Sequence, residues 1–95
     1  MVAVSLGKDG VLVVSQEGIY QGRPPQIQVV NTVGCGDSMV AGFSIGFEKG
    51  WDLPQAIRYA VAISAANALT KETGCFQQED LDRLLPQVTV EKLNL

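Results

Sequence analysis

The chain of 95 residues is long enough for one compact domain, and its composition, 46% hydrophobic and 18% charged, indicates a buried core and excludes a disordered tail. A formal net charge of −3, without any long run of Lys or Arg, argues against nucleic acid and anionic membranes as partners. The sequence has no histidine, and Cys35 and Cys75 form no CxxC pair, so no metal site is predicted.

The compartment is predicted from two sequence features. No apolar stretch is long enough to cross a bilayer, and no signal peptide is recognisable. We therefore expect a cytoplasmic protein whose two thiols are reduced.

The chain opens with a predicted β-hairpin. Val2 to Leu6 and Val11 to Ser15 are β-rich runs, and Gly7-Lys8-Asp9-Gly10 lies between them. We expect the Asp-Gly pair to supply the positive φ angles of a tight hairpin turn. Because a core strand starts directly at Val2, we also expect an exposed sheet edge and apolar face, covered by an N-terminal part or by another copy in a homo-oligomer.

Two more extended segments are predicted before the helices begin. A third strand covers Gly18 to Gln21, and Pro24-Pro25 interrupts the ladder before Ile27 to Val30.

Two consecutive helices follow. The first is predicted from Ser38 to Lys49, with Asp37 at its mouth and Gly50 at its C′ position. The second is predicted from Pro54 to about Thr70, with Asp52 as N-cap and Gln55 at the capping-box position. It is apolar nearly all round, as expected for a helix buried between layers.

The C-terminal segment is predicted to hold a short helix and one extended piece. The helix covers Gln78 to Leu85 and is ended by Pro86, and Val88 to Val90 is extended. Strands that feed helices indicate an α/β layer architecture.

A narrow polar stripe runs along the second helix. Ser64, Asn67 and Lys71 are three and four residues apart, so they share one face of an otherwise apolar helix. A ligand can lie along such a stripe, but a solvated edge gives the same pattern and is the commoner case.

The most informative segment, Asn31 to Asp37, joins a predicted strand to the first helix. Gly34 and Gly36 let the backbone approach a ligand closely, and backbone amides at a helix N-terminus bind anions. A carboxylate beside a phosphate site is what phosphoryl transfer requires, so Asp37 is a candidate general base. Spacing alone slightly favours the alternative that Asp37 or Ser38 only caps the helix.

Two common nucleotide motifs are absent. Gly34-Cys35-Gly36 lacks the third glycine of the dinucleotide fingerprint, and Gly7-Lys8-Asp9-Gly10 lacks the Gly-Lys-Ser/Thr ending of a P-loop.

The run Asn31 to Phe43, NTVGCGDSMVAGF, resembles the second signature of the ribokinase-like (PfkB) carbohydrate kinases. Ser5 to Gly10 is similar to the nucleotide-site hairpin of that family. The resemblance implies an α/β chain that forms the C-terminal part of a three-layer α/β/α fold. It also implies that residues 1–95 are a single nucleotide-binding and catalytic-base portion, without the N-terminal sugar-binding part and lid.

The resemblance further assigns roles. It implies that Asp37 is the catalytic base and that the amides of Gly34, Cys35, Gly36 and Asp37 form the anion hole. Residues implied to line the nucleotide pocket, besides Gly36 and Asp37, are Ser5, Leu6, Gly7, Lys8, Asp9, Gly10 and Asn67. ATP and Mg²⁺ are the implied cofactors, although no direct Mg²⁺ ligand is identifiable in this chain.

Within the family, Gln28 to Phe43 and Leu84 to Val88 are most similar to the 1-phosphofructokinases, and tagatose-6-phosphate kinases come next. The implied reaction is ATP-dependent phosphorylation of a sugar phosphate hydroxyl, with this chain inactive alone. A non-catalytic nucleotide-binding or assembly module is the alternative from another class.

Overall fold

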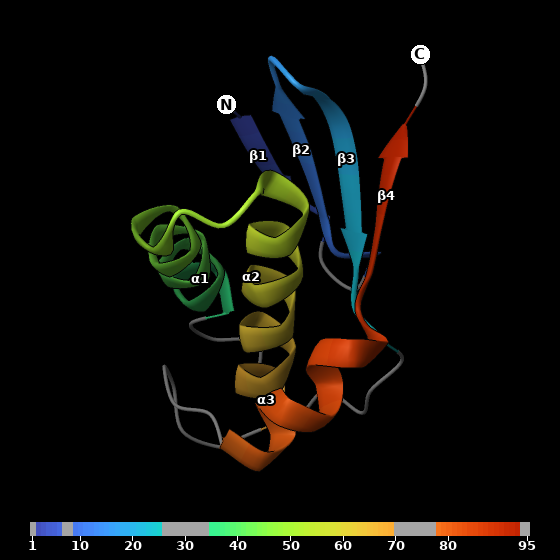
Figure 1. Cartoon of the computed structure of the whole chain (residues 1–95). Coiled ribbons are helices and arrows are strands. Elements are labelled where there is room, and N and C mark those ends of the chain that lie inside the picture. The colour runs from blue at the N-terminus through green and yellow to red at the C-terminus, as the bar shows by residue number, and fades with distance from the viewer. Residues whose placement is uncertain (1, 7–8, 26–34, 70–77, 94–95) are drawn as a thin grey trace.

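The computed structural model of the chain describes residues 2–6, 9–25, 35–69 and 78–93. Figure 1 shows a sheet whose one face is covered by a helix, with a second helix beside the first. The elements in chain order are β1 (Val2–Ser5), β2 (Val11–Ser15), β3 (Gly18–Arg23), α1 (Cys35–Lys49), α2 (Leu53–Ala68), α3 (Gln78–Leu84), the 3₁₀ turn η2 (Leu85–Gln87) and β4 (Thr89–Leu93). The α/β fold class predicted from the sequence is confirmed.

The sheet has the strand order β1-β2-β3-β4, and each neighbouring pair is antiparallel. The predicted first hairpin is present, with Ser5 opposite Val11. Its connection is longer than the tight turn that we predicted, because residues 6–10 lie between the paired positions. Gly10 has a φ of 94°, but no described residue other than glycine has a positive φ, so the assignment of a positive φ to Asp9 was wrong. Asp9 instead has a 3₁₀-helical conformation, and its N–H donates to the Leu6 carbonyl at 3.2 Å.

The two later strands are longer than predicted because they pair with each other. β3 continues through Gly22 to Arg23, whose partner in β4 is Thr89. β4 accordingly runs to Leu93, beyond the predicted Val90. The predicted strand at Ile27 to Val30 lies outside the described residues.

The core lies between α2 and one face of the sheet. Val11 and Val13 of β2 and Tyr20 of β3 point into it and are at most 9% exposed. The alternation of buried and more exposed positions along β2 is the pattern of a sheet covered on one face. α2 contributes eleven buried residues, which confirms that it is apolar nearly all round: Leu53, Ala56, Ile57, Ala60, Val61, Ala62, Ile63, Ala65, Ala66, Asn67 and Ala68.

α1 ends as predicted, and its C-terminus is a Schellman motif. Gly50 has a φ of 75°, its N–H donates to the Phe47 carbonyl at 3.2 Å, and the Trp51 N–H donates to the Gly46 carbonyl at 3.0 Å. These two bonds satisfy carbonyls that a helix end otherwise leaves unpaired. The short connection then leads directly into α2.

The start of α2 is fixed by the predicted cap. The Asp52 carboxylate accepts the backbone N–H of Gln55 at 3.0 Å, and Pro54 lies in the first turn. The described part of the helix ends at Ala68, and Thr70, the predicted end, lies outside the described residues.

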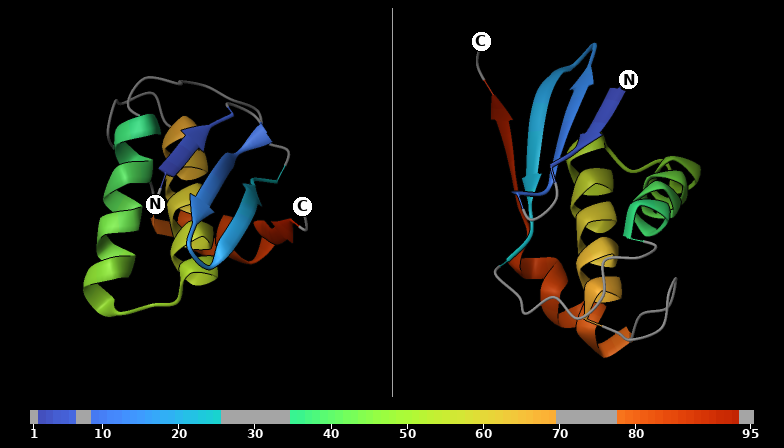
Figure 2. Two further views of the ribbon diagram at one scale, coloured as in Figure 1. Left: turned by 90° about the horizontal axis from the view of Figure 1, so that it is seen from above. Right: turned by 180° about the vertical axis from the view of Figure 1, so that it is seen from behind.

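α1 and α2 pack closely because glycine faces alanine at two levels of their contact. A Cβ placed on Gly42 would come within 2.6 Å of the Ala60 Cα, and one placed on Gly46 within 2.8 Å of the Ala56 Cβ. Pairing of later residues in α1 with earlier ones in α2 makes the helices antiparallel. The start of α1 and the end of α2 therefore lie at the same end of the pair, as the left view in Figure 2 shows.

Candidate active site

The candidate anion hole lies in the first turn of α1. We predicted that the helix begins at Ser38, but the backbone is already helical at Cys35, so Cys35, Gly36 and Asp37 all belong to α1. Glycine disfavours a helix interior, which hid this start from sequence analysis, yet the first turn tolerates it because its N–H groups have no intrahelical acceptor. Such amides, at the positive end of a helix dipole, are suited to bind phosphate.

The alternative in which Asp37 or Ser38 is the N-cap of this helix is wrong. An N-cap residue precedes the helical residues, whereas both of these lie inside α1. Asp37 is in the first turn, where a carboxylate interacts favourably with the helix dipole. Its side chain and Gly34 lie outside the described set, so the pairing of base and anion hole remains a prediction.

Asn67 is at the same end of the helix pair as the first turn of α1. It lies one residue before the last residue of α2, and that end of α2 is level with the beginning of α1 (Figure 2). The structure thus places two segments that are far apart in the sequence, Cys35 to Asp37 and the residue Asn67, at the same end of the helix pair.

Asn67 is buried, so its interpretation as part of a solvated edge was wrong. Its exposure is 0%, and it is the buried polar residue of the described core. Ser64 is half-buried, and Lys71 lies outside the described residues. A nucleotide contact at Asn67 remains a prediction, and it requires the nucleotide to reach a side chain that is covered here.

The end of β1 and the beginning of β2 lie at the end of the sheet nearer the C-terminus of α2 (Figure 1). Leu6 and Asp9 are exposed, while Gly10 is buried and lies against the Gly22 carbonyl, where a Cβ would collide with the oxygen. The side chain of Ser5 and the residues Gly7 and Lys8 lie outside the described set. These strand ends therefore lie toward the same end of the molecule as Asn67, and the nucleotide pocket between them remains a prediction.

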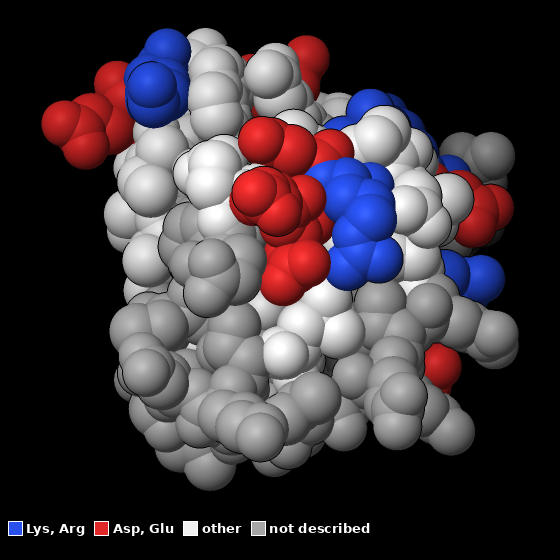
Figure 3. Space-filling view, turned by 90° about the horizontal axis from the view of Figure 1, so that it is seen from below, with Lys and Arg blue, Asp and Glu red and all other residues white. Residues whose placement is uncertain are grey.

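The charged surface has a mixed character. Figure 3 shows acidic side chains beside basic ones on the face seen from below, to which α3 belongs. One such pair is Arg83 and Asp80, whose Nη2 and Oδ1 atoms are 3.1 Å apart. Within the described ranges there is no cluster of three or more His, Cys, Asp or Glu residues that could hold a metal ion. We assign no catalytic step through a metal.

A shallow groove lies at the opposite end of the helix pair, around the connection between α1 and α2. Trp51 and Tyr59 meet there edge to face, with ring centroids 5.2 Å apart, and Pro54 and Leu85 also line it. Trp51 thus has a packing role.

None of the described helices is both long and apolar enough to cross a membrane.

The comparisons with known proteins decide the family. The sequence profile of the pfkB family carbohydrate kinases matches residues 1–94. The chain belongs to this family. The resemblance carried by residues 31–43 is thereby confirmed for nearly the whole chain.

Curated relatives of this PfkB chain are phosphofructokinases. It is 40% identical over 92 residues to the 1-phosphofructokinase of Bacillus subtilis (strain 168), covering 97% of this chain and 30% of that protein. It is 34% identical over 83 residues to the ATP-dependent 6-phosphofructokinase isozyme 2 of Mycobacterium tuberculosis (strain H37Rv), covering 87% of this chain and 24% of that protein. The chain thus spans less than one third of the length of these relatives.

A solved PfkB structure has the same arrangement of elements. The phosphofructokinase-2 of Escherichia coli, crystallised with potassium, superposes with a TM-score of 0.83 at 32% identity, covering 90% of this chain and 28% of that one. The same E. coli enzyme has also been solved in a tetrameric inhibited form. The four-stranded sheet and helices therefore correspond to part of a ribokinase-like fold.

Proposed function

We propose that this chain is the catalytic-base portion of an ATP-dependent kinase that phosphorylates a hydroxyl of a sugar phosphate, converting fructose 1-phosphate to fructose 1,6-bisphosphate. The observation that carries the proposal is the position of Cys35, Gly36 and Asp37 in the first turn of a helix. This position puts free amides and a carboxylate within one turn of each other, in a chain of the pfkB family.

Each part of the segment has a role in the reaction. The amides of Gly34, Cys35, Gly36 and Asp37 bind the transferred γ-phosphoryl group of ATP and stabilise the charge on its oxygens. The Asp37 carboxylate accepts the proton of the acceptor hydroxyl as its oxygen bonds to the γ-phosphorus. The bond from that phosphorus to the β,γ-bridging oxygen breaks, and ADP leaves with the electron pair.

The nucleotide is proposed to lie between the β1–β2 loop, from Ser5 to Gly10, and the C-terminal end of α2 with Asn67. Support comes from the placement of both segments toward the same end of the molecule (Figure 1). The sugar-binding part is proposed to belong to the portion of the kinase outside these residues, because the relatives are more than three times as long as the matched segment. The chain alone is therefore expected to be inactive.

Fructose 1-phosphate is preferred as substrate because the curated 1-phosphofructokinase of B. subtilis is more similar to this chain than the M. tuberculosis 6-phosphofructokinase isozyme 2 is. Tagatose 6-phosphate remains the alternative substrate. A non-catalytic nucleotide-binding module is the second candidate, favoured by the small share of each relative that the chain spans.

Two chimeric kinases test the proposal. In each, this chain replaces the matching segment of one relative, either the B. subtilis 1-phosphofructokinase or the M. tuberculosis isozyme, and ADP formation is measured with the sugar phosphate of that relative. We expect turnover in both chimeras and a smaller loss in the first. If both fold and bind Mg-ADP but neither turns over, the module function replaces the kinase function.

A further inference from the structure

The contact between α1 and α2 has a regular register. Gly42 lies against Ala60 and Gly46 lies against Ala56, so a step of four residues forward in α1 matches a step of four residues back in α2. At both glycines the other helix leaves no room for a Cβ, since the nearest atoms would be 2.6 and 2.8 Å away. The two helices therefore cannot slide along each other without a collision, and their register is fixed.

Continued toward the start of α1, this register places the first turn level with Asn67. Cys35 is seven residues before Gly42, and Asn67 is seven residues after Ala60. Seven residues make almost two complete turns of an α-helix, so both positions return to the side of their helix that carries the Gly42–Ala60 contact. Cys35 and Asn67 consequently belong to the facing sides of the two helices, at the end of the pair where α1 starts (Figure 2, left).

Asn67 differs in chemistry from the rest of the buried face of α2. It is 0% exposed, and the other buried residues of this helix are all apolar. Burial of a carboxamide is unfavourable unless its donor and acceptor atoms are hydrogen-bonded. The first turn of the facing helix carries N–H groups without an intrahelical acceptor. A buried carboxamide at this level is therefore suited to hold that turn in place.

We propose that Asn67 is a positioning residue of the anion hole, whose carboxamide contacts the first turn of α1 and fixes the direction of the amides of Cys35, Gly36 and Asp37. The inference rests on the proposed function for the role of these amides in binding the transferred phosphoryl group. Asn67 then acts on the reaction through the turn. A direct contact between Asn67 and the nucleotide is the competing outcome of the test.

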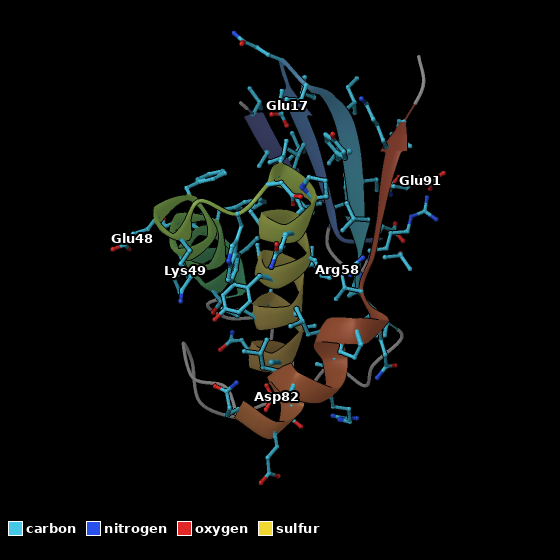
Figure 4. The ribbon with its side chains drawn as sticks, viewed as in Figure 1. Glu17, Glu48, Lys49, Arg58, Asp82 and Glu91 are labelled. Atoms are coloured by element: carbon cyan, nitrogen blue, oxygen red, sulfur yellow. The ribbon has the colours of Figure 1, made fainter. Side chains whose placement is uncertain are left out.

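Phosphate binding by the helix pair depends on the direction of these amides. The basic residues of α1 and α2 are Lys49 and Arg58, both labelled in Figure 4. Lys49 is in the last turn of α1 and Arg58 is nine residues before Asn67, so neither is at the end that holds the first turn of α1. What this helix pair contributes to the phosphoryl group is therefore a set of backbone dipoles, whose effect depends on their orientation.

Steady-state kinetics of the chimera with B. subtilis 1-phosphofructokinase test the proposal. Asn67→Ala should lower kcat about 10- to 100-fold, because a displacement of about 1 Å at the reacting group costs up to about that much. The KM for ATP and the preference for ATP over GTP should stay within about twofold of the parent, because the amides act on the transition state and no base contact is lost. Val61→Ala is the matched control, with kcat near that of the parent: Val61 is 1% exposed in the same helix but packs toward Gly22 of β3.

An NMR measurement on the isotope-labelled chain tests the contact without catalysis. The backbone amide resonances of Cys35, Gly36 and Asp37 should move in the Asn67→Ala chain and stay in place in the Val61→Ala chain. If Asn67→Ala does not fold, Asn67→Ser, which keeps a hydrogen-bonding group at the site, provides the same two readouts with smaller changes.

Three results would overturn the inference. The first is an unchanged kcat in the folded Asn67→Ala chimera. The second is a raised KM for ATP with unchanged kcat and an altered preference for ATP over GTP, which would assign a direct nucleotide contact to Asn67. The third is amide resonances of the first turn that move equally in the Asn67→Ala and Val61→Ala chains. A parent chimera without turnover refutes the proposed kinase function instead, and the amide resonances then decide by themselves whether Asn67 holds the turn.

Discussion

Replacement of Gly42 by alanine tests how α1 is held against α2. The new Cβ would lie 2.6 Å from the Ala60 Cα and 3.2 Å from the Ala60 Cβ and N atoms. Carbon atoms in contact are about 3.5–4.0 Å apart, so the helices must separate by about 1 Å. Overpacking costs about 1–3 kcal/mol, and the higher helix propensity of alanine returns about 1 kcal/mol. Because the obstacle is backbone, we expect an overpacking cost in the upper part of this range, about 2–3 kcal/mol, and therefore a net loss of about 1–2 kcal/mol in the free energy of unfolding.

Urea denaturation of the chain measures this loss, and a second pair of variants provides the control. At Gly46 the nearest obstacle is the Ala56 Cβ, so Ala56→Gly should restore much of the stability that Gly46→Ala removes. Ala60→Gly should restore less in the Gly42→Ala protein, because the Ala60 Cα remains in place. A Gly42→Ala protein as stable as the wild type, or equal rescue of both variants, would refute the close helix contact.

Three further substitutions test other parts of the fold by urea denaturation. Asp52→Ala removes the N-cap of α2 and should cost about 1 kcal/mol, while Asp52→Asn, which still caps, should cost little; equal losses would contradict the cap. Gly10→Ala combines a positive φ with a collision at the Gly22 carbonyl, so we expect a loss of at least about 1–3 kcal/mol, and an unchanged midpoint would contradict the loop geometry. Ile57→Ala empties a fully buried site beneath the sheet and should cost about 2–5 kcal/mol; a loss below that of Asp52→Ala would contradict its burial.

Local sequence signals predicted the elements whose ends depend on local chemistry. The Asp52 cap, the Gly50 terminus and the strand at Val11 to Ser15 are all present as predicted. The lengths of the other strands depend on pairing between segments that are far apart in the sequence. β3 and β4 are longer than their propensities indicated because each completes the ladder of the other.

The motif indicates where the candidate site lies, whereas helix propensity does not predict where α1 begins. Gly34 and Gly36 flank Cys35, and glycine has a low helix propensity, so the sequence did not predict a helix start there. The backbone of the structure is nevertheless helical from Cys35. The burial of Asn67 depends on tertiary packing, which the spacing of Ser64, Asn67 and Lys71 does not reveal.

The turnover of an Asp37→Asn chimera tests the central claim most directly, with Asp52→Asn as the matched substitution. Asp52 lies at the opposite end of the helix pair, where an asparagine still caps α2. In the chimera with B. subtilis 1-phosphofructokinase, Asp37→Asn should lower kcat about 10²–10⁴-fold, with the KM for ATP and the thermal stability near those of the parent. Asp52→Asn should leave kcat unchanged. Equal turnover by the Asp37→Asn protein and its parent would show that Asp37 is not the base.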